Sequence, residues 1–263
     1  KLALFVGLDA DALAVVNADD SRSGEVARST RAKVLTFGIE APAALRAVNV
    51  ETGLGGTSFS VESREGAYWV ELKLPGLHNV YNALAAIGAV SRFNVPREAV
   101  LSGLKSVDIV PGRFEVVDSR RGFYAVVDYA HTPDALERLL KAVRALSSGK
   151  VIAVFGCGGD RDRTKRPVMG RIATDLSDLA VITSDNPRSE DPAAIIMEIE
   201  AGAGANRRSI ADRKEAIAFA LGRAEPGDAV VVAGKGHESV QILKDKTVEF
   251  NDRTVVEKLL WKR

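Results

Sequence analysis

The sequence contains a single cysteine and no long hydrophobic run, which argues against a disulfide-bonded protein and against a membrane-spanning one. Cys157 has no second cysteine with which to form an internal disulfide, which is typical of a protein of the reducing cytoplasm. No apolar run reaches the ~18 residues that a membrane helix needs, and the first residues do not resemble a signal peptide. A cytoplasmic protein without a membrane span is therefore expected.

The chain also lacks an excess of charge of either sign. Its 36 lysines and arginines are balanced by 35 aspartates and glutamates, so the formal net charge is only +1. Because there is no basic field, nucleic acid is not expected as a partner. The 263 residues, 46% of them hydrophobic, are enough for two domains with sizeable cores.

The first stretch of the chain, to about Val110, is rich in predicted strands. Its apolar and alternating segments predict strands at residues 14–17, 33–37, 57–61 and 68–72. The last two follow a pair of glycines and alternate in polarity, which is typical of an antiparallel pair. After them, the alanine-rich residues 82–90 predict a helix that is buried on most of its sides.

From Phe114 onward, predicted strands alternate with predicted helices. Apolar runs predict strands at residues 123–127, 151–155, 179–182 and 229–233. Thr132 is placed to cap a helix that has Pro133 at its first position. Four apolar side chains of that helix fall on one face: Leu136, Leu139, Leu140 and Val143. This order predicts a parallel sheet covered on both faces, a doubly wound α/β domain.

Charged residues and glycines follow four of these predicted strands. They occupy residues 128–133, 156–163, 184–188 and 234–238. Any one segment alone is as well explained by a helix cap or a turn. Ligands of doubly wound domains bind beyond the carboxyl ends of the strands, so four such segments at one rim favour a ligand site.

The glycines at this rim do not complete either of two well-known nucleotide motifs. Gly156 and Gly158 suggest a dinucleotide fingerprint, but Arg161 stands where its third glycine belongs. Gly234-Lys235 suggests a phosphate-binding loop, but residue 229 is alanine and residue 236 is glycine. The glycines are better interpreted as positions where backbone approaches a ligand closely.

The charges at the rim suit an amino acid as ligand. Arg161 and Arg188 are each able to bind a carboxylate with two hydrogen bonds, whereas Asp185 and Glu238 suit an ammonium group. The alternative is that these arginines pair with neighbouring acids at the surface. Cys157, within the glycine segment, is a poor candidate nucleophile because the three histidines are distant in sequence.

Two asparagines carry a second signal in the first stretch. Asn79 and Asn82 lie three residues apart where a helix begins, so both amides can point one way and present a donor and an acceptor to adenine. Asn79 is equally well explained as an ordinary N-cap. Farther on, Arg113 follows Pro111-Gly112 at the junction of the two halves, where it would reach a nucleotide phosphate.

These segments resemble a known enzyme family. Residues 77–83, Leu-His-Asn-Val-Tyr-Asn-Ala, are similar to the His-Asn-x-x-Asn segment of Mur ligases and folylpolyglutamate synthetases. The combination of residues 128–133, 155–162, 185–188 and 234–238 is more specific and resembles the Mur ligases that add meso-diaminopimelate. The resemblance covers essentially the whole chain.

The resemblance implies a particular domain organisation. Residues 1–113 would be the rear part of a P-loop-type, ATP-binding central domain, and residues 114–263 a Rossmann-like C-terminal domain that binds the amino acid. A UDP-sugar domain, the phosphate-binding loop and an acidic magnesium ligand would precede Lys1 in the natural protein. The chain by itself is therefore expected to be inactive, and the protein is expected to be a monomer.

The resemblance also assigns roles to residues. Those implied for ATP are Asn79, Asn82, Arg113 and Asp128, with His131 as a catalytic residue near its phosphates. Those implied for meso-diaminopimelate are Arg161, Asp185, Asn186, Pro187, Arg188, Gly234 and Glu238. Lys1 aligns with a catalytic lysine that the family carries as a carbamate, which binds Mg²⁺.

The implied reaction is ATP-dependent amide formation. The terminal carboxylate of UDP-N-acetylmuramoyl-L-alanyl-D-glutamate would attack the γ-phosphate of ATP, and the amine of meso-diaminopimelate would then attack the acyl phosphate. Two alternatives remain open at this point. One is a related ligase that adds lysine or acts on folate, and the other is a nucleotide-binding module without catalytic activity.

Overall fold

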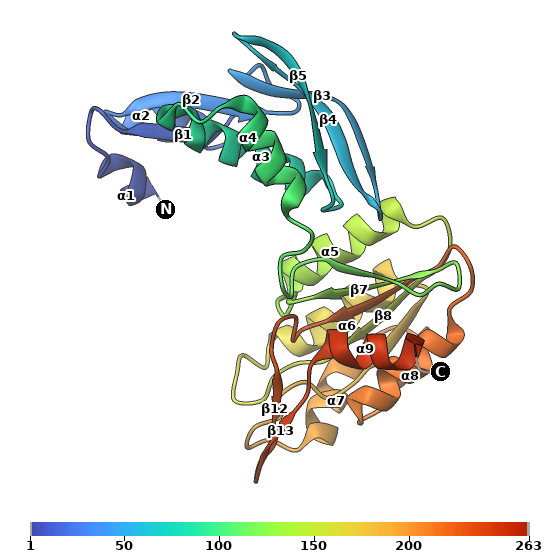
Figure 1. The fold of residues 1–263 in the computed structure, drawn as a ribbon. Coiled ribbons are helices and arrows are strands. Elements are labelled where there is room, and N and C mark those ends of the chain that lie inside the picture. The colour runs from blue at the N-terminus through green and yellow to red at the C-terminus, as the bar shows by residue number, and fades with distance from the viewer. Residues whose placement is uncertain (1, 262–263) are drawn as a thin grey trace. The chain divides into compact units, whose positions relative to one another are not determined.

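The computed structural model describes residues 2–261, which form two compact units (Figure 1). The first unit extends to Asp108 and the second begins at Ile109. Within residues 2–261, no helix combines the length and the apolar character needed to cross a membrane.

The first unit is built on one five-stranded sheet with the order β1-β2-β3-β4-β5 (Figure 1). The strands β1, β2 and β3 run parallel, and β3, β4 and β5 are antiparallel. The strands are β1 (Leu13–Asn17), β2 (Lys33–Gly38), β3 (Leu45–Gly53), β4 (Gly56–Ser63) and β5 (Gly66–Leu72). The helices are α1 (Leu2–Val6), α2 (Ser23–Ser29), α3 (Leu77–Val90) and α4 (Arg97–Ser106), with a 3₁₀ turn at Ser91–Phe93.

The strands predicted for this unit are confirmed, including the antiparallel pair. Phe59 of β4 lies opposite Val70 of β5, and both are buried because alternate side chains of the pair face the core. Helices pack on both faces of strand β1. Val15 packs against the cluster that includes α3, and Val16 packs on the other face, near α2.

Helix α3 is buried along one face, and the prediction that it is buried on most sides is wrong. Val80, Leu84 and Ile87 pack against the sheet, whereas Asn82 and Ala86 are exposed to solvent. Alanine satisfies either environment, so an alanine-rich run does not distinguish a buried helix from a one-sided one.

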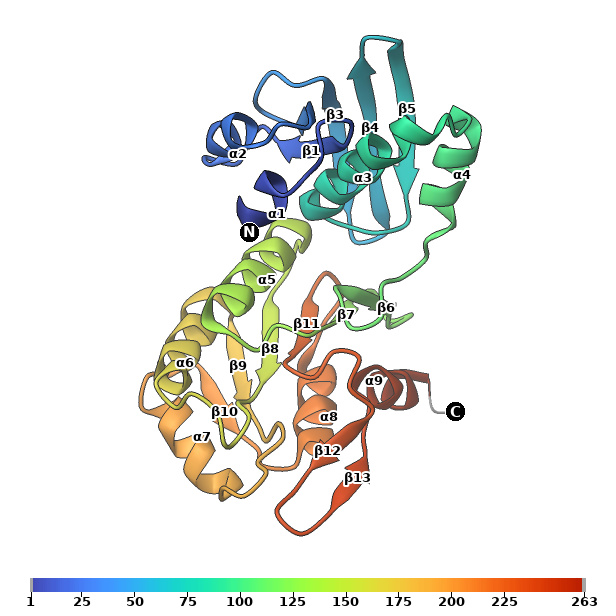
Figure 2. The ribbon, with the colours of Figure 1, turned by 90° about the vertical axis from the view of Figure 1, so that its left-hand side faces the viewer.

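The second unit contains a six-stranded sheet with the order β10-β9-β8-β11-β7-β6 (Figure 2). Its strands are β6 (Glu115–Asp118), β7 (Tyr124–Asp128), β8 (Val151–Phe155), β9 (Leu179–Ile182), β10 (Arg207–Ser209) and β11 (Ala229–Ala233). A small hairpin consists of β12 (Val240–Ile242) and β13 (Thr247–Glu249). The helices are α5 (Pro133–Leu146), α6 (Lys165–Leu176), α7 (Pro192–Glu200), α8 (Arg213–Arg223) and α9 (Asp252–Trp261).

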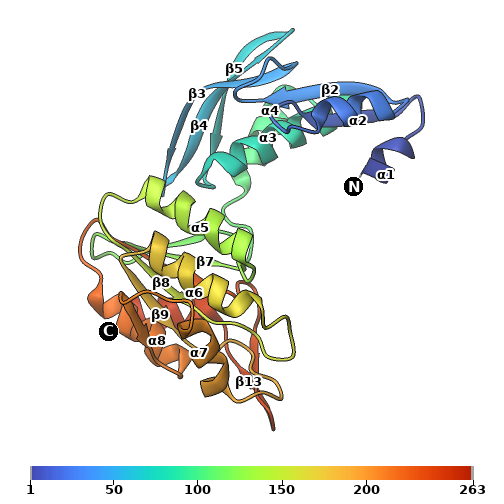
Figure 3. The same cartoon turned by 180° about the vertical axis from the view of Figure 1, so that it is seen from behind.

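Helices cover both faces of this sheet, as predicted for a doubly wound α/β domain. Helices α5, α6 and α7 lie on one face, and α8 and α9 lie on the other (Figures 2 and 3). The strands β7 to β11 are parallel, and only β6, at one edge, is antiparallel to its neighbour. Because β7, β8, β9 and β11 are covered on both sides, they are the continuous apolar runs seen in the sequence.

Helix α5 begins as predicted. The Thr132 hydroxyl accepts a hydrogen bond from the Ala135 amide at 3.3 Å, and Pro133 occupies the first turn. The four apolar residues assigned to one face, Leu136, Leu139, Leu140 and Val143, are all buried.

A buried ion pair lies at the carboxyl ends of strands β9 and β11 in this unit. Arg213 of α8 donates to both carboxylate oxygens of Asp252, at 2.8 and 2.7 Å, and neither side chain is exposed. The same guanidinium donates to the backbone carbonyl of Ala233 at 3.0 Å and to that of Ser184 at 3.5 Å. These two carbonyls come directly before Gly234 and Asp185, so the pair supports the segments that carry both residues.

We predict that Asp252→Ala destabilises the second unit by about 3–5 kcal/mol, because it leaves the Arg213 guanidinium buried without its carboxylate. The exposed Asp245→Ala serves as the matched control and should change stability by less than about 0.5 kcal/mol. Urea unfolding, with hydrogen exchange of the β11 amides reporting on this unit, measures both. Equal effects of the two substitutions would contradict the importance of the pair.

Candidate functional site

The four strand ends singled out in the sequence line one pocket of about 520 Å³ in the second unit. Its lining includes Tyr129 and His131 after β7, Gly158, Arg161 and Lys165 after β8, Asp185, Asn186 and Arg188 after β9, and Gly234 and Glu238 after β11. The prediction that these segments meet at one rim is therefore confirmed.

Pro187 is buried and is not among the residues that line the pocket. A Cβ added to Gly159 would come within 2.0 Å of the Pro187 carbonyl oxygen, so the two loops lie in direct backbone contact. The Gly159 amide donates to the Asn186 carbonyl at 2.9 Å across the same contact. Only glycine permits this approach at residue 159, whereas a Cβ at Gly158 would come within 2.9 Å of Arg188 Nη1.

A buried arginine holds the same two loops from below. Arg166 donates to Glu190 at 2.8 and 2.9 Å, to Glu198 at 2.8 Å and to the Gly158 carbonyl at 3.3 Å. Hydrogen bonds from Arg166 and from the Asp160 amide lower the pKa of Glu190 to about 2. Glu190 is thus an ionised partner of Arg166.

Arg188 is free of the acids that were considered as its surface partners. Within residues 2–261 it forms no ion pair with Glu190 or Asp191. Its Nη1 donates to the Gly159 carbonyl at 2.8 Å, with a longer contact of 3.4 Å to the Asn186 carbonyl. The Nε and Nη2 groups make no hydrogen bond in the described part of the chain, so they remain for a ligand in the pocket.

The amide of Asn186 has a defined orientation. Its Oδ1 accepts hydrogen bonds from the Lys235 ammonium and from the Ile242 amide, both at 2.9 Å. Its Nδ2 donates to Glu238 Oε2 at 2.8 Å. Lysine and a backbone N–H only donate, and a carboxylate only accepts, so the reverse orientation is excluded.

This orientation narrows what Asn186 can offer a ligand. An amide oxygen has two lone pairs, and both are used, so Asn186 has no acceptor left for an ammonium group. One N–H of Nδ2 makes no hydrogen bond within the described residues, and it suits a carboxylate. Asn186 therefore suits a carboxylate of the ligand and not its ammonium group.

The acids of the pocket suit an ammonium group. Burial by itself would raise the pKa of Glu238, but hydrogen bonds from Lys235 and Asn186 and the charges of Lys235 and Arg188 outweigh it and lower that pKa. Glu238 Oε2 accepts both of those hydrogen bonds, which leaves Oε1 for a ligand. Asp185 Oδ1 accepts a hydrogen bond from the backbone N–H of Asn186 at 2.7 Å, which leaves Oδ2 for a ligand.

Gly234 lies against the Asp185 carboxylate. Its φ is +120°, and a Cβ there would come within 2.8 Å of Asp185 Oδ2. Any other residue would therefore strain the backbone and cover the carboxylate oxygen that faces the pocket.

The ring of Tyr129, which also lines the pocket, contacts three side chains, and it was not singled out from the sequence. The ring of Tyr129 lies 4.6 Å from that of His131, 5.1 Å from that of His237 and 5.2 Å from the Arg113 guanidinium carbon. Lys165, also missed, donates to the His131 carbonyl at 2.7 Å. The only signal for Tyr129 was its position between Asp128 and His131.

Asp128 anchors the segment that carries Arg113. Its Oδ2 accepts from the Phe114 amide at 2.8 Å, and its Oδ1 accepts from the Ala130 amide at 2.7 Å. The carboxylate therefore fixes the end of β7 relative to the residues just before β6.

In the first unit, Asn79 and Asn82 are hydrogen-bonded to each other. Asn82 Nδ2 donates to Asn79 Oδ1 at 3.1 Å, and Asn79 Nδ2 donates to the Pro75 carbonyl at 2.8 Å. The N-cap of α3 is Gly76, so the alternative of Asn79 as N-cap is wrong. Asn79 is buried and Asn82 is exposed, so Asn82 has the larger capacity for a ligand.

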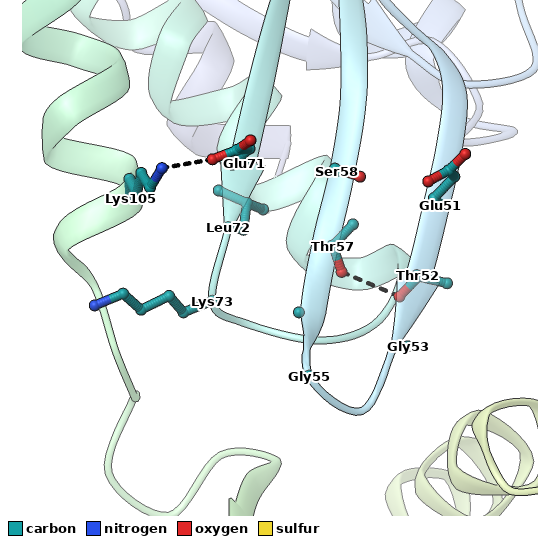
Figure 4. A pocket seen from close by; sticks show the side chains of 11 residues that line it. Glu51, Thr52, Gly53, Gly55, Thr57, Ser58, Glu71, Leu72, Lys73 and Lys105 are labelled. Carbon is teal, nitrogen blue, oxygen red and sulfur yellow. Dashed lines mark hydrogen bonds and ion pairs between the residues drawn. The ribbon is translucent and has the colours of Figure 1, made fainter.

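A hydroxyl pair holds the start of α3 to the β3–β4 hairpin (Figure 4). Thr52 and Thr57 are 3.0 Å apart through their Oγ1 atoms, and Thr52 accepts from the Gly76 amide at 2.9 Å. They line an open hollow of about 510 Å³, where Lys105 pairs with Glu71 at 2.6 Å. No pattern in the sequence predicted this hollow.

Metal ligands do not gather in the described part of the chain. Among residues 2–261, no group of three or more histidine, cysteine, aspartate or glutamate side chains is placed to hold a metal ion. Lys1, expected as a carbamate that binds Mg²⁺, lies outside the described residues.

Two family models match the chain. The Mur ligase middle domain matches residues 1–90, and the Mur ligase, glutamate ligase domain matches residues 112–236. A curated relative, the UDP-N-acetylmuramoyl-L-alanyl-D-glutamate–2,6-diaminopimelate ligase of Geobacillus thermodenitrificans, is 46% identical over 245 residues. That match covers 92% of this chain and 50% of the relative, so the chain spans about half the length of the curated relative.

Solved structures show the same fold. A structure of UDP-N-acetylmuramoyl-L-alanyl-D-glutamate–2,6-diaminopimelate ligase is 37% identical, with a TM-score of 0.70 over 94% of this chain and 53% of its own. The MurF ligase from Thermotoga maritima, solved in complex with ADP, is 22% identical, with a TM-score of 0.65 over 90% of this chain and 52% of its own.

We predict that Cys157 is inert in the folded protein. Burial raises the pKa of its thiol to about 12, and its Sγ lies 3.7 Å from the Met169 sulfur in the core. Alkylation by iodoacetamide at pH 8, followed by mass spectrometry, should be at least ~100-fold slower than in denaturant, because the thiolate is the nucleophile. Ser148→Cys, at an exposed position, is the reactive control. Rapid alkylation of folded Cys157 would contradict the prediction.

Proposed function

The chain belongs to the Mur ligase family, and from this we propose that the full-length protein is an ATP-dependent ligase of peptidoglycan synthesis. It would add meso-diaminopimelate to UDP-N-acetylmuramoyl-L-alanyl-D-glutamate. In this proposal, residues 1–113 are the rear part of the ATP-binding central domain and residues 114–263 are the amino-acid-binding domain. A monomer in the cytoplasm, dependent on Mg²⁺, is part of the same proposal, and the magnesium rests on family resemblance alone.

The observation that carries this proposal is the division of charge in the pocket of the second unit. Arg188 Nε and Nη2 and one N–H of Asn186 offer donors to a carboxylate, whereas Glu238 Oε1 and Asp185 Oδ2 offer acceptors to an ammonium group. An amino acid presents both groups. Arg188 would bind the distal carboxylate of meso-diaminopimelate, and Arg161, an exposed residue that also lines the pocket, supplies a cation for the other carboxylate.

The second carboxylate distinguishes meso-diaminopimelate from lysine. The two amino acids have nearly the same reach, but lysine lacks the distal carboxylate and would leave Arg188 without a partner. An unpaired guanidinium in a partly closed pocket loses the hydration of bulk water without gaining a carboxylate. This charge balance favours the diaminopimelate-adding branch over the lysine-adding one.

The proposed reaction has two steps. The terminal carboxylate of the nucleotide-linked dipeptide attacks the γ-phosphorus of ATP, which releases ADP and gives an acyl phosphate. The amine of meso-diaminopimelate then attacks the acyl carbon, the C–O bond to phosphate breaks, and an amide and inorganic phosphate result. The pocket residues act by binding and orienting the amino acid so that its amine is presented for attack.

The proposed nucleotide contacts differ in kind between the residues. Asn82 is exposed and retains a donor and an acceptor for adenine, and Asn79 would act by orienting it. Asp128 would accept from a ribose hydroxyl. Arg113, against Tyr129, and His131 would lie near the phosphates.

For the nucleotide, we predict that Asn82→Ala and Asp128→Ala in the full-length enzyme each weaken ATP binding by about 5- to 30-fold, since each removes one or two hydrogen bonds. The KM for meso-diaminopimelate in each variant serves as the internal control and should change little. Unchanged affinity for ATP in both variants would contradict the proposal that Asn82 and Asp128 bind the nucleotide.

For the amino acid, we predict that Arg188→Ala raises the KM for meso-diaminopimelate by roughly 30- to 1,000-fold, the effect of losing about 2–4 kcal/mol from a bidentate, charge-assisted pair. The KM for ATP should stay nearly constant. Arg188→Lys should restore the KM only in part, because an ammonium cannot form the two parallel hydrogen bonds.

The exposed Arg171→Ala is the matched control for loss of an arginine, and it should leave the KM unchanged. The proposal would be wrong if Arg188→Ala changed the use of meso-diaminopimelate by less than about threefold, or under ~1 kcal/mol. It would also be wrong if the wild-type enzyme used lysine equally well.

A further inference from the structure

Lys235 is the most deeply buried charged residue of the segment that follows β11. Its side chain has no exposure to solvent, and its ammonium donates to Asn186 Oδ1 at 2.9 Å and to Glu238 Oε2 at 2.8 Å. Both partners line the pocket, but Lys235 does not. It therefore touches the two residues that would contact the ligand without reaching the ligand itself.

A buried ammonium is costly, so its partners are informative. Removing the lysine ammonium from water is strongly unfavourable unless an opposite charge and hydrogen bonds compensate. Within the described residues, Glu238 is the one carboxylate that pairs with Lys235. The pair is balanced only when Glu238 is ionised, which is the state that an ammonium ligand needs.

The two hydrogen bonds of Lys235 also select which atoms are left for the ligand. By occupying Asn186 Oδ1, the ammonium excludes the reversed amide, in which oxygen would face the carboxylate of Glu238. By occupying Glu238 Oε2, it leaves Oε1 as the free oxygen. One buried cation thus sets the polarity of both side chains.

We propose that Lys235 is a positioning residue of the amino-acid pocket, whose buried ammonium holds Glu238 ready for an ammonium group and Asn186 ready for a carboxylate. This inference rests on the proposed function, because it needs a ligand that carries both groups. Lys235 contacts neither the ligand nor the reacting atoms. Its effect is transmitted through Asn186 and Glu238 alone.

The competing explanation is that Lys235 only stabilises the fold. The two explanations differ in coupling. If Lys235 acts through Glu238, its removal has little further effect once Glu238 has lost its charge. If it acts through stability, its effect is independent of Glu238 and extends to ATP binding and to activity at saturating amino acid.

The experiment is a double-mutant cycle in the full-length enzyme, with the KM for meso-diaminopimelate as the readout. Lys235→Met and Glu238→Gln should each raise this KM by about 10- to 100-fold. The KM of the double variant should exceed the higher of the two single-variant KM values by no more than about threefold. The KM for ATP should be unchanged in all three.

The control is Lys214→Met, which removes an exposed lysine from the same unit and should leave the KM for meso-diaminopimelate as in wild type. Direct binding of meso-diaminopimelate by calorimetry provides a second readout that does not depend on turnover. Thermal unfolding of each variant reports on the fold.

The inference is overturned if Lys235→Met changes the KM by less than about threefold, or if the effects of the two substitutions multiply. If Lys235→Met does not fold, Lys235→Gln, which keeps an N–H donor, takes its place in the cycle. Failure of Lys235→Gln to fold also counts against the proposal, because Lys235 would then be a residue of the fold. If wild type does not use meso-diaminopimelate, the proposed function fails instead.

Discussion

The second unit depends on the pairing of buried cations with carboxylates. The side chains of Arg166, Arg213 and Lys235 have no exposure to solvent, and each pairs with a carboxylate. The carboxylates of Arg166 and Arg213 come from other segments of the chain, whereas Glu238 lies three residues after Lys235. A charge in such a place is tolerated only when it is paired and hydrogen-bonded, so each cation restricts the segments around it. All three lie beside or beneath the loops that follow the parallel strands. The sheet places the loops at one edge, and the buried cations determine their conformation.

This arrangement explains how a single pocket offers opposite polarities at short range. Polar side chains near one another tend to satisfy each other, and a ligand then has nothing to bind. Here Asn186 Oδ1 accepts hydrogen bonds from Lys235 and from the Ile242 backbone amide, and Glu238 Oε2 accepts from Lys235 and Asn186. Glu238 Oε1 and one N–H of Asn186 remain for a ligand. The backbone carbonyls of Gly159 and Asn186 occupy only one nitrogen of Arg188 in the same way. The specificity of the pocket thus comes as much from the buried side of each group as from the side facing the ligand.

Most of the secondary structure and the rim of the second unit could be predicted from the sequence, for physical reasons. Strands buried on both faces need continuous apolar runs, and residues at their carboxyl ends must meet at one edge. The sequence could not reveal which lone pair of Asn186 is occupied, or that Lys235 is fully buried, because both depend on contacts between segments some fifty residues apart. The one-sided burial of α3 was missed because alanine fits either environment. The partner of Glu190 was missed because Arg166 reaches it from helix α6, 24 residues earlier in the chain.

The contact between Gly159 and Pro187 has a consequence for how this pocket can change. With the Gly159 α-carbon so close to the Pro187 carbonyl, neither loop can alter its path without the other. The two loops therefore have to change together. Grafting residues 185–188 from a ligase of different amino-acid preference would import their side chains onto a support shaped for the original loop. A successful graft has to carry residues 156–161 as well, so evolution between amino-acid preferences is expected to proceed through paired changes in both loops.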